Sequence, residues 1–201
     1  MKKTLAFISC LSIMGIFFFA CQPDQKSVAD TGGQAADAKP AMTKADSIKR
    51  GEYLITSMGC NDCHTPKMMT DHGPDLDRSR MLSGHPASEA LPKMPDKSFV
   101  APGQWILMSS GITSFTGPWG TSFAANLTPD ETGTGNWTYD NFKTAIRKGK
   151  FKGQENGRPL LPPMPWPNLT NLTEEDYANM WQYLRSLPPV KNVVPTALPP
   201  A

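Results

Sequence analysis

The sequence has little of what most metal sites and disulfide frameworks need, since its 201 residues include only four cysteines and three histidines. Cys60 and Cys63 form the one closely spaced cysteine pair, and the lack of a second pair leaves a four-ligand zinc site poorly supported. No βαβ pattern surrounds this pair, which argues against a thioredoxin-like redox site. The formal net charge is +2 and no dense basic tract occurs, so no nucleic acid is expected as a partner.

One long hydrophobic run occurs, at residues 5–19 near the N-terminus. It follows two lysines and ends before Ala20, so residues 1–20 are predicted to be the signal peptide of a protein exported to the bacterial periplasm or cell envelope. The run is too short to be assumed a permanent transmembrane helix. Cys21 follows directly, as in the lipobox of bacterial lipoproteins, which predicts a lipid that anchors Cys21 to a membrane. The alternative is ordinary cleavage that leaves Cys21 free, while Cys10 leaves with the leader.

The composition of the chain changes after residue 45. Residues 21–45 contain hardly any large apolar side chain, which predicts a flexible linker behind the lipid anchor. Residues 46–190 have the length of one domain. Residues 191–201 form a proline-rich tail with little to bury, so this tail is predicted to be disordered.

Apolar residues at helical spacing predict three helices, at residues 46–58, 139–148 and 174–187. Asp46 or Ser47 is the predicted N-cap of the first helix, and Thr173 is that of the third. Most of residues 65–136 reads as loop. Two short strands are predicted within that stretch, at residues 104–108 and 121–125.

The run Cys60-Asn61-Asp62-Cys63-His64 carries the strongest chemical signal in the chain. Two thiols three residues apart, followed at once by a histidine, match the attachment signature of c-type haem. One helical turn presents both sulfurs to the vinyl groups of the porphyrin, and the next residue brings its imidazole beneath the iron. The motif therefore predicts one covalent haem c, with thioethers at Cys60 and Cys63 and His64 as the proximal ligand. A small disulfide is the remaining alternative.

The sixth position of such an iron decides between electron transfer and chemistry on a small molecule. Met164 is the predicted ligand, because prolines on both sides stiffen its loop and the neighbouring Leu161 and Trp166 can exclude water. Its rivals are two other methionines and, for a bis-histidine iron, two histidines, namely Met94, Met81, His72 and His85.

A haem motif after an N-terminal helix, a methionine in a proline-rich loop and a final amphipathic helix resemble the class I cytochrome c fold. Further segments resemble the cytochrome c domains associated with membrane-bound alcohol, gluconate and nicotinate dehydrogenases, at residues 117–120, 126–130, 132–133, 135–137, 145–149 and 163–165. The resemblance implies an all-α fold, with three or more helices and long loops packed around one haem. It also implies electron relay between redox donor and acceptor proteins rather than enzyme activity. Trp119 and Asn126 are expected at the haem edge or propionates, with a core aromatic and a plain turn as equally good readings.

Other functions stay open from the sequence. An open or exchangeable sixth ligand would make the chain a haem enzyme or sensor, and a fixed place in a larger dehydrogenase or oxidase complex would make it a subunit rather than a mobile carrier. A concentration of basic residues predicts a surface that steers an acidic redox partner, or else a solvated helix end. Its members are Lys143, Arg147, Lys148, Lys150, Lys152 and Arg158.

Overall fold

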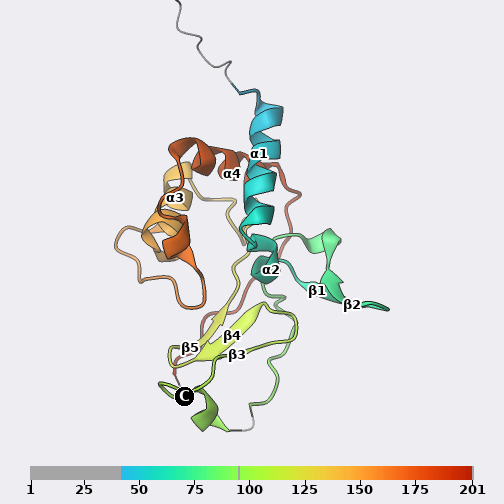
Figure 1. The fold of residues 1–201 in the computed structure, drawn as a ribbon, viewed down its shortest axis with the longest axis vertical. Coiled ribbons are helices and arrows are strands. Elements are labelled where there is room, and N and C mark those ends of the chain that lie inside the picture. The colour runs from blue at the N-terminus through green and yellow to red at the C-terminus, as the bar shows by residue number, and fades with distance from the viewer. Residues whose placement is uncertain (1–41, 95, 201) are drawn as a thin grey trace, which may run out of the picture. The chain divides into compact units, whose positions relative to one another are not determined.

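The computed structural model describes residues 42–94 and 96–200 (Figure 1). The predicted signal peptide, the predicted lipidation site Cys21 and most of the predicted linker lie outside the described residues. The helices of the described part are α1 (Lys44–Ser57), α2 (Cys60–His64), α3 (Tyr139–Lys148) and α4 (Glu174–Ser186). The strands are β1 (Lys67–Thr70), β2 (Gly73–Leu76), β3 (Leu107–Met108), β4 (Ser114–Gly117) and β5 (Gly120–Phe123). Short 3-10 helices occur at η1 (Arg78–Arg80), η2 (Lys97–Val100), η3 (Phe151–Gly153) and η4 (Trp166–Leu169).

Helix α1 begins two residues earlier than predicted. Its N-cap is Thr43 rather than Asp46 or Ser47, and the Thr43 hydroxyl oxygen accepts the Asp46 N–H at 3.2 Å. Asp46 lies instead in the first turn, where its negative charge interacts favourably with the helix dipole. Helices α3 and α4 occupy their predicted positions, each capped by a threonine, Thr138 and Thr173.

Helices α1 and α4 pack closely against each other. A Cβ atom added at Gly51 would lie 2.0 Å from the carbonyl oxygen of Asn179, so only glycine permits this approach. Across the same contact the Ser47 hydroxyl donates to Asn179 Oδ1 at 2.5 Å, and Arg50 pairs with Asp176 at 2.9 Å. This packing offsets the low helix propensity of the glycine.

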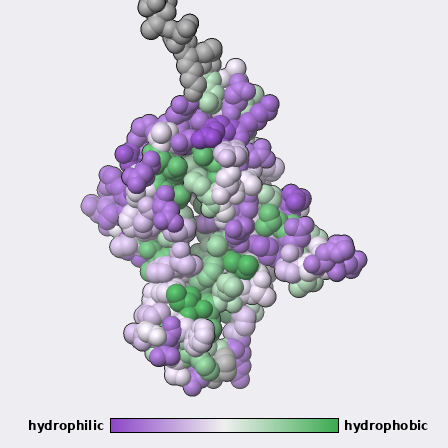
Figure 2. All heavy atoms as spheres, in the orientation of Figure 1, coloured by the Kyte–Doolittle hydropathy of each residue, from purple (hydrophilic) through white to green (hydrophobic). Residues whose placement is uncertain are grey.

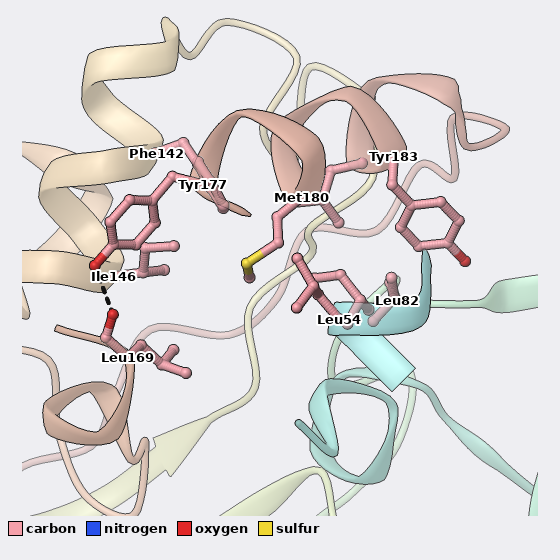
Figure 3. Packing of buried hydrophobic residues seen from close by; sticks show 10 residues of the cluster. Leu54, Leu82, Phe142, Ile146, Leu169, Tyr177, Met180 and Tyr183 are labelled. Carbon is pink, nitrogen blue, oxygen red and sulfur yellow. Dashed lines mark hydrogen bonds between the residues drawn. The ribbon is translucent and has the colours of Figure 1, made fainter. Parts of the chain in front are cut away.

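The buried core joins α1, α3 and α4 with η4 and the loop after η1 (Figure 3). Tyr177 donates its hydroxyl hydrogen to the carbonyl oxygen of Leu169 at 2.5 Å, so this buried polar atom is paired. The cluster comprises Leu54, Ile55, Leu82, Phe142, Ile146, Leu169, Tyr177, Met180, Tyr183 and Leu184.

The predicted all-α class I cytochrome c architecture is wrong, because the described chain also contains two small antiparallel sheets. Strands β1 and β2 form a hairpin, and β3, β4 and β5 form a three-stranded sheet in that order. Gly117 pairs with Gly120 across a two-residue turn, the tight connection that suits short antiparallel strands. Such short strands show no clear period-2 pattern, which is why the region reads mostly as loop. The predicted short strands overlap β3 and β5, but their middle partner β4 has no counterpart among the predictions.

The C-terminal segment runs back along the three-stranded sheet. Thr121 and Leu198 exchange two backbone hydrogen bonds, at 3.0 and 2.9 Å, so this segment pairs with β5. Asn192 donates from its side chain to the carbonyl oxygens of Ser83 and His85, at 2.7 and 2.8 Å. The predicted disordered tail thus has specific partners in the structure.

Hydrophilic residues cover much of the helical part of the face drawn in Figure 2, while hydrophobic residues reach the surface nearer the middle of the view. Among the strongly exposed apolar side chains are Met69 at 76%, Trp105 at 68% and Met108 at 64%. They lie on β1, on β3 or just before β3, so the small sheets leave apolar surface uncovered. Within the described ranges, no helix is both long and apolar enough to cross a bilayer.

Candidate haem attachment site

All five residues of the CNDCH motif form the short helix α2. Gly59 starts this helix in the left-handed conformation at φ +70°. Cys60 and Cys63 are both half-buried free thiols. Residues at positions i and i+3 share one face of a helix, so the two thiols point from the same side of one turn.

The pKa values of the two thiols bear on whether this pair is a redox site or a haem attachment site. Burial raises the pKa of Cys60 to about 11, and burial, helped by the charge of Asp62, raises the pKa of Cys63. A thioredoxin-type redox thiol needs a lowered pKa, so this environment disfavours that reading. Among residues 42–94 and 96–200, no group of three or more His, Cys, Asp or Glu side chains is arranged to hold a metal ion, which leaves the zinc alternative without support.

A backbone carbonyl fixes the His64 imidazole. Nδ1 of His64 lies 2.8 Å from the carbonyl oxygen of Ala125, and because a carbonyl only accepts, Nδ1 carries the proton. This tautomer leaves the lone pair on Nε2, which is the form that binds a metal. Burial lowers the pKa of His64 more than the Ala125 hydrogen bond raises it, so the imidazole is neutral near pH 7.

The segment after η1 holds both sides of this contact in place. The Gly84 N–H donates to the His64 carbonyl oxygen at 2.7 Å, and the His85 N–H donates to the Ala124 carbonyl oxygen at 2.9 Å. Gly84 has φ +80°, and a Cβ atom there would lie 2.5 Å from the Ala124 carbonyl oxygen. Sequence reasoning missed Gly84 and the Ala125 carbonyl because neither contributes a reactive side chain, and the glycine itself was the one available signal.

Two further side chains close the C-terminal end of α2. Lys67 Nζ donates to the carbonyl oxygens of Asp62 and Thr65, at 2.8 and 2.7 Å. The buried Thr65 hydroxyl donates to Asn61 Oδ1 at 3.0 Å and accepts the Leu82 N–H at 2.9 Å. These bonds satisfy polar groups that so short a helix leaves unpaired. The sequence indicates Lys67 and Thr65 only weakly, as polar residues that closely follow the motif.

Met164 lies in the loop between η3 and η4 and is half-buried. It packs against the core cluster, and Cys60 packs against the same cluster. The fold therefore brings the first motif cysteine and the predicted sixth ligand to the rim of one apolar core. The rivals Met81 and Met94 are also half-buried, but neither is among the described members of this cluster or its rim.

The two histidine rivals lie elsewhere. His72 is exposed in the turn between β1 and β2. His85 is only 1% exposed, its Nδ1 lies 2.8 Å from Thr113 Oγ1, and its ring contacts Phe123 with centroids 4.8 Å apart. It therefore packs on the side of the three-stranded sheet, and its Nε2 is buried without a hydrogen-bond partner in the described chain.

The two residues expected in the haem environment have protein partners. Asn126 is 5% exposed, its Oδ1 accepts the Thr128 N–H at 3.0 Å, and its Nδ2 donates to the Val190 carbonyl oxygen at 2.8 Å. Asn126 therefore joins its own turn to the C-terminal segment, and its expected place at the haem edge stays a prediction. Trp119 is half-buried in the turn between β4 and β5, and its Nε1 donates to Ser122 Oγ at 3.3 Å.

The predicted basic concentration is partly neutralised by acidic neighbours. Lys143 lies 3.3 Å from Glu174, and Arg147 pairs with the same carboxylate. Lys148 pairs with Glu155 at 2.7 Å. The solvated helix end with paired charges therefore describes this part of α3 better than an uncompensated basic face.

A short helix with two thiols one turn apart, ending in a histidine with a free Nε2, matches the attachment signature of c-type haem. The chain is homologous to the cytochrome c subunits of dehydrogenases. It is 30% identical over 137 residues to the gluconate 2-dehydrogenase cytochrome c subunit of Pantoea cypripedii, which covers 68% of this chain and 22% of that subunit. It is 29% identical over 152 residues to the fructose dehydrogenase cytochrome subunit of Gluconobacter japonicus, covering 75% of this chain and 23% of that subunit.

A third relative is the cytochrome c subunit of the quinone alcohol dehydrogenase of Gluconobacter oxydans, 28% identical over 158 residues, or 78% of this chain and 24% of that subunit. The chain thus spans about a quarter of the length of these curated relatives. No protein-family model matches it. The predicted resemblance to cytochrome c domains of alcohol and gluconate dehydrogenases is confirmed.

Proposed function

We propose that this chain is a monohaem c-type cytochrome that relays single electrons. One observation carries the proposal, namely that α2 places Cys60 and Cys63 one turn apart, directly before a His64 whose Nε2 is free. This donor set fits a covalent haem c, with thioethers at both cysteines and Nε2 of His64 on the iron. When bound, the haem supplies a one-electron couple between ferric and ferrous iron. The sequence contains one such motif, which supports a single haem.

Met164 is the proposed second axial ligand. Its loop is stiffened by prolines, and its side chain packs on the core that Cys60 also contacts. A methionine on the iron leaves no free coordination position for a substrate. The proposed role is therefore electron transfer without a catalytic activity of its own.

The proposed redox partners are a dehydrogenase subunit as electron donor and a second redox protein as acceptor. This assignment is supported by the names of the relatives, which are cytochrome subunits of gluconate, fructose and alcohol dehydrogenases. The proposed organisation is a signal peptide at residues 1–20, a linker at 21–45 with a lipid on Cys21, and a cytochrome domain at 46–190. It is supported by the leader-like sequence and the lipobox-like position of Cys21.

The test is the absorption spectrum of the exported, full-length protein in its oxidised and reduced states. We expect a c-type haem spectrum, haem that stays on the polypeptide after denaturation, and a ferric methionine-to-iron band that Met164→Ala abolishes. Met94→Ala is the matched control and keeps the band. Haem that stays attached after denaturation of the Cys60→Ala/Cys63→Ala double variant contradicts covalent attachment at α2.

The same spectra separate the alternative functions. A wild-type protein with haem but without the methionine band contradicts Met164 ligation. Carbon monoxide binding by the reduced wild type then favours a haem enzyme or sensor with an open site. Loss of a bis-histidine spectrum in His85→Ala would instead assign the sixth position to His85.

A further inference from the structure

A single side chain connects the three-stranded sheet to the loop that carries Met164. The hydroxyl of Ser122 in β5 donates to the carbonyl oxygen of Pro162 at 2.6 Å, across 40 residues of sequence. A second acceptor, the carbonyl oxygen of Phe115, lies at the longer distance of 3.4 Å. Ser122 is 8% exposed and its bond to Pro162 is partly buried, so water competes with it less than at a fully exposed site.

The loop around Met164 makes few other hydrogen bonds that could fix its position. Prolines at positions 162, 163 and 165 have no N–H to donate. The Met164 N–H reaches only the Leu161 carbonyl oxygen inside the same loop, at 3.4 Å. Within the described part of the chain, Ser122 provides the one recorded side-chain hydrogen bond from outside to residues 161–165.

Trp119 fixes the direction of the Ser122 hydroxyl. Its indole Nε1–H donates to Ser122 Oγ at 3.3 Å, and because an indole N–H is only a donor, Ser122 accepts here. The hydroxyl hydrogen of Ser122 is then free to point at Pro162. The Trp119 ring lies against Gly117, where a Cβ atom would come within 2.5 Å of ring carbons. The hairpin turn thus packs closely against the indole ring.

We propose that Ser122, oriented by Trp119, is a positioning residue for Met164 and sets how firmly the Met164 thioether stays on the haem iron. The proposal rests on the proposed function, in which Met164 is the sixth ligand. A loop released from Ser122 samples more conformations, so Met164 gives way more easily to an external ligand. Neither Ser122 nor Trp119 is required to touch the haem for this role.

The experiment is a titration of the ferric, haem-loaded protein with imidazole, which competes with Met164 for the iron, followed by loss of the methionine-to-iron band. We expect Ser122→Ala to bind imidazole about fivefold more tightly than wild type, the effect of one lost neutral hydrogen bond. Trp119→Phe keeps a ring against Gly117 but removes the N–H donor, so a smaller change of about twofold is expected. Ser122→Thr restores the hydroxyl and the wild-type affinity.

Ser114→Ala is the matched control, because it removes a buried serine hydroxyl from the neighbouring strand β4 without touching the Met164 loop. Imidazole affinities that are equal in wild type and Ser122→Ala, with the methionine band present in both, overturn the positioning role while leaving Met164 ligation intact. A band missing from the wild type overturns both, and Met164→Ala then leaves the spectrum unchanged. An equal gain in Ser114→Ala and Ser122→Ala also overturns the proposal, since the effect would be general loosening of the sheet.

Discussion

His64 and His85 both bind the protein through Nδ1 and leave Nε2 without a recorded hydrogen bond in the described chain. The partner of His64 is a carbonyl, so its tautomer is fixed with the lone pair on Nε2. The partner of His85 is the Thr113 hydroxyl, which can donate or accept, and so fixes no tautomer. At the residue scale, His64 is therefore held in the tautomer that binds a metal. His85 is a buried group whose tautomer its partner does not fix.

Burial makes His85 a source of acid sensitivity. Burial lowers the pKa of His85, and the nearby Glu89 raises it by less. The unfolded chain therefore binds a proton more readily than the folded one, and stability is complete above the unfolded pKa of about 6.5 and is lost as the pH falls below it. We expect the Tm to decrease from about pH 7 to about pH 5 and His85→Gln to reduce this decrease.

Thermal denaturation followed by circular dichroism at both pH values measures this effect. His72→Gln is the control, since His72 is exposed in a turn, and it retains the wild-type decrease. The same decrease in His85→Gln as in wild type would contradict the assignment.

At the scale of elements, α2 depends on two loops that carry no motif. The stretch around Gly84 lies between the carbonyl oxygen of His64 and the backbone of Ala124 and Ala125, where a Cβ atom would come within 2.5 to 2.7 Å of backbone atoms. Any residue larger than glycine must displace the chain that holds the His64 ring. The geometry of the attachment helix is therefore set in part by a position 20 residues after it.

Gly84→Ala tests this dependence. We expect a loss of about 2 to 3 kcal/mol in the free energy of unfolding, from positive-φ strain plus backbone collision. We also expect a lower yield of attached haem. Gly73→Ala is a matched control, because Gly73 has φ +102° but nothing lies within 4 Å of its added Cβ. It is expected to cost about 1 kcal/mol, from the backbone alone.

Denaturant unfolding and the haem content per polypeptide measure both effects. If Gly84→Ala and Gly73→Ala lose the same stability and haem, the close approach at Gly84 does not hold α2 in place.

The elements that sequence predicts well are those with local signals. Helices α3 and α4 have threonine caps and apolar residues at helical spacing, and the motif residues of α2 were readable directly. Strand β4 is defined by its pairing with β3 and β5, and its own sequence contains no local pattern that predicts a strand. The residues that hold the candidate site in place cannot be predicted from local sequence for the same reason. The Ala125 carbonyl binds His64 and the Ser122 hydroxyl binds Pro162, and both partners are far away in sequence.

At the scale of the whole described chain, the C-terminal segment contacts three regions, two loops and the strand β5. Val190 accepts a hydrogen bond from Asn126, Leu198 pairs with Thr121, and Asn192 reaches the segment at residues 83–87. Composition alone favours a loose tail, because these residues bury little apolar surface. The order comes from hydrogen bonds to backbone groups that would otherwise lack partners.

Asn192 is the centre of that connection. Its Nδ2 donates to the carbonyl oxygens of Ser83 and His85, and its Oδ1 accepts the Ala87 N–H at 3.0 Å. Asn192→Ala leaves these backbone groups unpaired, so we expect the free energy of unfolding to fall by about 2 kcal/mol. Guanidinium denaturation of the haem-loaded protein measures the loss. Val193→Ala changes a side chain that is 66% exposed and is expected to cost less than about 0.5 kcal/mol.

The comparison of these two variants decides whether the C-terminal segment unfolds together with the rest of the domain. If the segment unfolds with the domain, removing the Asn192 side chain lowers the stability of the domain while the exposed neighbour does not. Equal stabilities for wild type, Asn192→Ala and Val193→Ala would mean that the segment opens without cost, as a disordered tail does. A loss in Asn192→Ala that also lowers haem retention would extend the conclusion to the site, because Ser83 and His85 flank the glycine on which the His64 contact depends.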